Sequence, residues 1–92
     1  MKPAASALGG LLVQVASRSG RGAALAGVWR QVVGETVARH SVPRRFEAGM
    51  LVVACDAAQW RDSLDAQRPA LLARIQAVVG EASVRSLVFQ WP

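Results

Sequence analysis

The sequence is poor in the residues that most often carry out chemistry, since it contains one cysteine, Cys55, and one histidine, His40. A single cysteine cannot form an internal disulfide, which favours an intracellular setting. A zinc site needs several Cys or His ligands, and the six acidic residues are scattered without metal-ligand spacing. We therefore expect no metal or other cofactor, with Cys55 buried in a strand and His40 at the end of a helix.

Long apolar runs are also missing. The apolar N-terminal patch ALGGLLVQVA covers residues 7–16, which is too short to span a bilayer. A secretory signal also needs a charged start and a small-residue cleavage site, which Lys2 and this patch imitate only weakly. The sequence therefore predicts a cytoplasmic protein with no membrane association.

Acidic residues are few, so the charge is strongly positive. Eleven basic residues face six acidic ones, the net charge is +5, and ten of the basic residues are arginine. The planar arginine fork suits phosphate, although an arginine- and alanine-rich composition also follows from codon bias. We interpret the charge as a sign of an anionic partner.

The 92 residues, of which 52% are hydrophobic, fit one domain over 1–92. Three-to-four-residue spacing of apolar positions predicts helices over 4–16 and 23–39. A hairpin should follow, with strands over 44–47 and 50–55 joined by a turn at 48–49. A helix beginning near Asp56 with a Gln59 capping box, kinked or split at Pro69, then leads to a last strand over 84–91. The fold class is α+β, with a sheet of about three strands and helices on one face.

Strand alternation divides the apolar residues of the second hairpin strand between two faces. Leu51, Val53 and Cys55 share the face that we expect against the helices. The opposite face would carry the residues Met50, Val52, Ala54 and Val88. An apolar patch there suits a protein partner or a homodimer.

The arginines fall into two groups. Those on the predicted helices are expected to solvate outer faces, whereas Arg18 and Arg21 lie in a flexible loop and Arg44 and Arg45 start a strand. Loop and strand-edge arginines without nearby acids are good phosphate ligands, so we predict nucleic-acid binding by these four. Among the tryptophans, only Trp91 is a candidate base-stacking platform.

Motifs for nucleotide hydrolysis and catalysis are missing. The sequence has no G-x-x-x-x-G-K-[ST] loop for phosphates. It also lacks the GXXG loop with which KH domains clamp a nucleic-acid backbone. Because no catalytic constellation is present, we expect a protein that is not an enzyme.

Several segments together resemble the DciA-like family. The resemblance covers roughly 8–91, and its most specific parts are the Trp29–Val33–Gly34 unit, His40-Ser41-x-Pro43, Gly49-x-Leu51-x-Val53 and Trp60-x-x-x-Leu64. It implies a KH-like α+β module that acts in bacterial DNA replication. Such proteins bind the replicative DNA helicase and help to load it on single-stranded DNA without hydrolysing ATP. The chain departs from the family pattern at Gln76, where the family often has Asn, and at Val88, where a basic residue is common.

The resemblance favours a non-enzymatic adaptor that binds the replicative DNA helicase and, through the four arginines, single-stranded DNA. Two alternatives stay open. One is a protein-interaction or homodimerisation module without DNA binding, and the other is a KH-like RNA-binding protein.

Overall fold

The computed structural model of the chain describes residues 20, 22–80 and 83–91. The helix predicted over 4–16 and the predicted ligands Arg18 and Arg21 lie outside the described residues. The elements in chain order are η1 (Gly22–Leu25), α2 (Ala26–Val33), α3 (Glu35–Ala38), β1 (Ser41–Glu47), β2 (Met50–Cys55), α4 (Ala58–Ala66), α5 (Arg68–Val79) and β3 (Ser86–Gln90).

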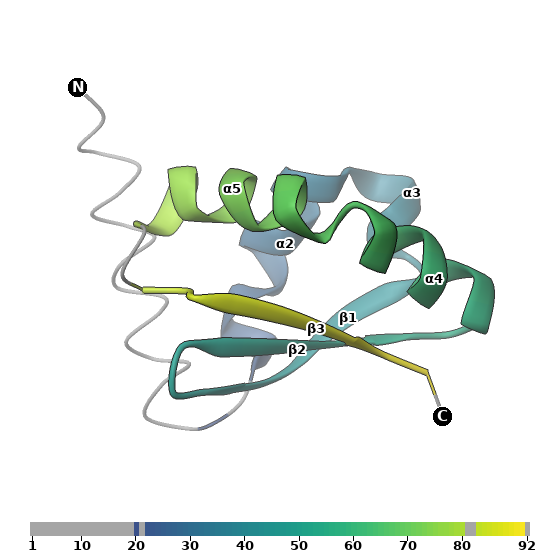
Figure 1. Ribbon diagram of the computed structural model, residues 1–92, viewed down its shortest axis with the longest axis horizontal. Helices are drawn as coiled ribbons and strands as arrows, with labels where there is room; N and C mark the ends of the chain where they lie inside the picture. Colours follow the sequence, from purple (N-terminus) through teal and green to yellow (C-terminus); the bar gives the residue numbers. More distant parts are fainter. Residues whose placement is uncertain (1–19, 21, 81–82, 92) are drawn as a thin grey trace.

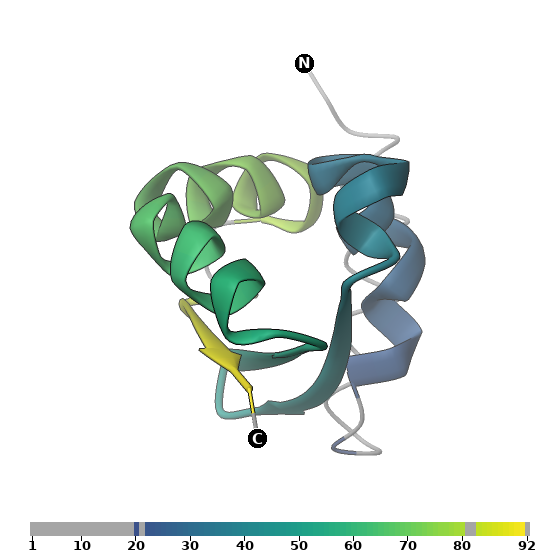
Figure 2. The same ribbon diagram turned by 90° about the vertical axis from the view of Figure 1, so that its right-hand side faces the viewer.

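The three strands form one mixed sheet in the order β1-β2-β3. β1 pairs with β2 in antiparallel fashion through the hairpin, and β3 pairs with β2 in parallel. The four α-helices lie on the same side of the sheet (Figures 1 and 2). This confirms the predicted α+β class, and the uninterrupted apolar sequence of β2 fits its central place. The likeness to KH domains stays a prediction.

The helix predicted over 23–39 is wrong as a single element. The chain forms a 3₁₀ turn, then α2, and then breaks at Gly34 before the short α3. Gly34 has a φ of +90°, which ends the helical path and which glycine adopts without a steric penalty. A Cβ at Gly27 or at Gly34 would meet nothing within 4 Å, so no other backbone packs closely against either glycine.

The strand boundaries also differ from those predicted. The turn at Ala48 and Gly49 and the bounds of β2 are confirmed. β1 begins at Ser41, three residues earlier than expected, and includes Pro43. Proline is compatible with an edge strand, where its missing N–H breaks no ladder. β3 ends at Gln90 and is shorter than expected, so Trp91 follows the strand and lies exposed.

Trp29 ties α2 to the sheet. Its side chain is 1% exposed, and its indole Nε1–H donates a hydrogen bond of 2.9 Å to Ser41 Oγ. Ser41 Oγ in turn donates to the Val37 carbonyl at 2.8 Å, and the Trp29 ring lies 5.9 Å from the Phe89 ring. This contact set joins α2, the segment after it, β1 and β3 in one core.

The start of α4 corrects another expectation. Its N-cap residue is Ala57, and no side chain caps it, so the predicted capping box of Asp56 and Gln59 does not form. The Asp56 carboxylate instead hydrogen-bonds His40. The predicted break near Pro69 is confirmed, because α4 ends before Gln67 and α5 begins with Pro69 in its first turn, where proline is tolerated.

Gly22 packs against the backbone of β1, which makes it sensitive to any side chain. A Cβ there would lie 2.9 Å from Arg44 N and 3.0 Å from Pro43 C. Neither backbone atom can rotate away, so we expect Gly22→Ala to lower the free energy of unfolding by about 1–3 kcal/mol. Gly27→Ala is the matched control. It has open space within α2 and should stabilise by up to about 1 kcal/mol. Urea denaturation followed by circular dichroism measures both, and shifts of the same sign would contradict this packing.

Candidate nucleic-acid interface

A β-bulge exposes two consecutive arginines on β1. The register with β2 shifts between Pro43 and Arg45, so Arg44 is an extra residue in the strand. Pro43 and Phe46 are both buried, while Arg44 and Arg45 between them are both exposed. Regular alternation would turn one of the two arginines toward the core. The bulge therefore supplies two adjacent cations to the surface without removing Phe46 from the core.

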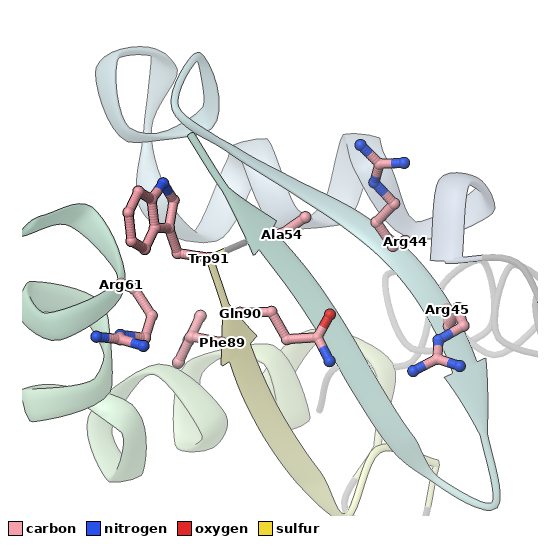
Figure 3. Close-up of a pocket in the computed structure, with 7 residues that line it drawn as sticks. All are labelled: Arg44, Arg45, Ala54, Arg61, Phe89, Gln90 and Trp91. Carbon is pink, nitrogen blue, oxygen red and sulfur yellow. The ribbon is translucent and has the colours of Figure 1, made fainter. Parts of the chain in front are cut away.

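Arg44 and Arg45 line an open groove of about 640 Å³. Its lining is contributed by all three strands, the residue after β3 and α4, and consists of Arg44, Arg45, Ala54, Arg61, Phe89, Gln90 and Trp91. Figure 3 shows Arg44 and Arg45 on one side of the groove and Trp91 and Arg61 on the other, with Ala54 and Gln90 between them. Residues that are far apart in the sequence thus form one surface.

The groove is positively charged. Three of its seven lining residues are arginines and none is acidic. Among the described residues, neither Arg44 nor Arg45 forms an ion pair, while Arg61 Nε lies 2.9 Å from Asp62 Oδ1. Solvent-exposed pairs such as the last are weak. The arrangement suits a polyanion whose phosphates contact both sides of the groove.

The four residues predicted to contact a protein partner are unequal in exposure. Met50 is 36% exposed, Ala54 and Val88 are half-buried, and Val52 is 3% exposed. Val52 is absent from the core cluster that contains Leu51 and Val53, as alternation predicts. The burial of Val52 contradicts the expectation of an open apolar face. Ala54, also predicted on that face, lines the groove with the arginines. Partner contact through Met50 and Val88 stays a prediction.

Three residues of the groove, Arg61, Phe89 and Gln90, are not predicted from the sequence. The sequence predicts that Arg61 solvates a helix face, and it indicates no binding role for Phe89 or Gln90. Arg61 follows Trp60 near the start of α4, and Gln90 ends β3, so nothing in the local sequence connects them with Arg44. The sequence predicts Trp91 as a base-stacking platform, and its side chain is 45% exposed. The other two tryptophan rings already have packing partners, since Trp29 is buried in the core beside Phe89 and Trp60 stacks on His40.

The His40 and Cys55 side chains do not form a nucleophile pair. His40 Nδ1 lies 2.9 Å from Asp56 Oδ2, and its ring stacks on Trp60 with centroids 4.5 Å apart. Cys55 is buried in the core cluster, as predicted. Burial, and secondarily the Asp56 carboxylate, raise the pKa of the Cys55 thiol, so it stays protonated at neutral pH and is a poor nucleophile. Within the described ranges, no three His, Cys, Asp or Glu residues gather in a group able to hold a metal ion.

The buried thiol predicts a loss of stability at alkaline pH. Because the folded state raises the pKa of Cys55, the unfolded chain releases this proton first. The stabilisation is therefore complete below the ordinary thiol pKa of about 8.5 and is lost as the pH rises through the folded-state pKa. Few other groups titrate in this range, since the chain has no tyrosine and one lysine. Urea midpoints at pH 7 and 10 should differ less in Cys55→Ala than in the parent chain, and equal differences would contradict the assignment.

No helix within the described residues is long and apolar enough to cross a membrane.

Comparison with known proteins gives a family match over residues 3–89, to the family described as "Dna[CI] antecedent, DciA". A UPF0232 protein of Streptomyces avermitilis is 40% identical over 68 residues, which cover 72% of this chain and 38% of that protein.

Two further relatives are similar. A UPF0232 protein of Streptomyces coelicolor is 40% identical over 63 residues, which cover 66% of this chain and 33% of that protein. One of Mycolicibacterium smegmatis is 38% identical over 66 residues, which cover 72% of this chain and 34% of that protein. The matched region thus spans between 33% and 38% of each relative's length. The family match includes five of the seven residues that line the groove, Arg44, Arg45, Ala54, Arg61 and Phe89. This chain belongs to the DciA family.

Proposed function

We propose that this protein is a non-enzymatic adaptor in bacterial DNA replication that binds single-stranded DNA and the replicative DNA helicase and assists helicase loading. Family membership supports the replication role. The observation that carries the DNA-binding part is the groove, which combines three arginines, no acid and an exposed tryptophan.

The groove chemistry favours a single strand over a duplex. Arginines bind the phosphates of either form. An exposed aromatic ring adds binding energy only where a base is free to stack on it, and bases in a duplex are already stacked on their neighbours. Binding should therefore be strongly salt-dependent and tighter for single strands.

Fluorescence anisotropy with a labelled single-stranded oligonucleotide tests this proposal across a salt series. We expect affinity to fall steeply with salt, and unlabelled single strands to compete better than a duplex of the same length. No binding at low salt would remove the DNA part of the proposal. RNA of the same length as a competitor distinguishes the KH-like RNA-binding alternative, which predicts that RNA competes better.

Co-purification tests the helicase part. The tagged chain should retain the replicative helicase of its own cell when extracts are treated with nuclease, so that DNA does not bridge the two. Recovery of the helicase from untreated extract only would show that the association depends on DNA. Failure in both extracts would leave the chain as a nucleic-acid-binding module without this partner.

A further inference from the structure

We infer that the groove contains a site for one unpaired nucleotide, in which the base stacks on Trp91 above Ala54 and hydrogen-bonds Gln90. This inference rests on the proposed single-stranded DNA binding, and it names the residues that would distinguish bases from phosphates. The arginines on the two sides of the groove would then hold the phosphates that flank the base.

Trp91 is the tryptophan with an available ring face. It follows the last residue of β3 and is 45% exposed, whereas Trp29 is buried and Trp60 is covered by His40. No stacked or tilted aromatic neighbour of Trp91 is found among the described residues. A large exposed apolar side chain beside cations is the arrangement with which proteins bind unpaired bases.

Ala54 leaves room beside the Trp91 ring. It lies opposite Val42 of β1 and Gln90 of β3 in the sheet register, and it is half-buried at the groove surface. Its methyl group is small, so the groove stays open between the arginines of β1 and Trp91 (Figure 3). A larger side chain at this position would occupy the space of the base without removing any charge.

Gln90 supplies polar groups beside the ring. It is exposed and extends over β2 in Figure 3. A carboxamide both donates and accepts, so it can hydrogen-bond an edge of any of the four bases. The site should therefore be tolerant of sequence, with specificity for the presence of a base and not for its identity.

The phosphate contacts come from both sides. Arg44 and Arg45 approach from β1, and Arg61 approaches from α4, where its bond to Asp62 uses Nε. Phosphates lie on each side of a base along a strand, so a base on Trp91 places one toward β1 and one toward α4. This geometry explains why an arginine of a helix and two of a strand share one groove with an aromatic ring.

The test compares a ten-nucleotide thymidine strand with an abasic strand of the same length, which keeps the phosphates and lacks the bases. The full chain should bind the thymidine strand about tenfold or more tightly than the abasic strand. Trp91→Ala and Ala54→Leu should each remove most of this preference without changing the salt dependence, and Trp91→Phe should keep most of it. Ala73→Leu, an exposed position of α5, is the control for Ala54→Leu and should behave as the parent chain.

The outcomes separate this inference from the proposed function. Equal binding of both strands by the parent chain, or an unchanged preference in Trp91→Ala, would overturn the base site and leave phosphate binding intact. No binding of either strand would overturn the proposed DNA binding and the base site together. Circular dichroism and urea midpoints keep the variants interpretable, because Trp91 and Ala73 are exposed and their replacement should leave folding unchanged.

Discussion

The variant in which Arg44 and Arg45 are both replaced by alanine is expected to bind single-stranded DNA at least tenfold more weakly at low salt. Hydrogen bonds to charged groups contribute about 1.5–3 kcal/mol each, and both arginines line the groove. The slope of log affinity against log salt should also become shallower by about 1.4, since each phosphate contact with a single strand contributes about 0.7. Anisotropy titrations at several salt concentrations measure both changes.

The matched control replaces Arg39 and Arg74 with alanine. Both are exposed, neither lines the groove, and the net charge changes by the same amount. If binding depends only on total charge, the two double variants will weaken it equally, and the groove is then not the interface. If the groove is the interface, the control variant should lose less than half as much binding free energy as the variant without Arg44 and Arg45. Both variants should fold normally, because all four side chains are at the surface.

The largest effect on folding is expected for Trp29→Ala, with a loss of about 3–5 kcal/mol in the free energy of unfolding. The indole is 1% exposed, contacts the Phe89 ring and donates to Ser41 Oγ. A domain of this size has only several kcal/mol of net stability, so the variant should be largely unfolded without a stabilising osmolyte. Urea denaturation followed by circular dichroism gives the value.

Two further variants distinguish the contributions of packing, hydrogen bonding and burial to the loss of stability in Trp29→Ala. Trp29→Phe keeps much of the packing and removes the donor to the buried Ser41 hydroxyl, which should cost about 1–3 kcal/mol. Trp91→Ala removes the same side chain from an exposed position and should change stability by less than about 0.5 kcal/mol. Equal destabilisation by Trp29→Ala and Trp91→Ala would contradict the assignment of Trp29 to the core and Trp91 to the surface.

The core contacts of Trp29 also position the proposed interface. Ser41 begins β1, which carries Arg44 and Arg45, and Phe89 belongs to β3, which leads to Trp91. One buried side chain thus holds the two strands whose surface residues line opposite sides of the groove. Weakening it should reduce DNA affinity indirectly, and osmolyte rescue of folding should then restore binding.

The local sequence was sufficient to predict several elements. The β2 strand, the turn at Ala48-Gly49 and the division of the helices near Pro69 all follow from nearby residues. Apolar continuity identifies a central strand, glycine favours the turn, and proline fits only the first turn of a helix. The family resemblance also came from the sequence and is confirmed by the match over residues 3–89.

Other features depended on contacts that no local pattern describes. The helix predicted over 23–39 breaks at Gly34, and Asp56 bonds His40 across the hairpin instead of capping α4. Gly34 and Asp56 each have several locally acceptable conformations, and tertiary packing selects among them. Gln76 likewise donates to the Val84 carbonyl at 2.8 Å, which connects α5 to the segment before β3.

The sequence alone determined the α+β class, the central strand and the burial of Cys55. It could do so because these properties follow from residue type and from periodicity over a few residues. Only the tertiary structure decided that a bulge exposes both arginines, that Val52 is buried, and that Arg61 and Trp91 complete the groove. Register and helix packing set those positions, and they depend on residues tens of positions apart, so the groove exists only in the folded chain.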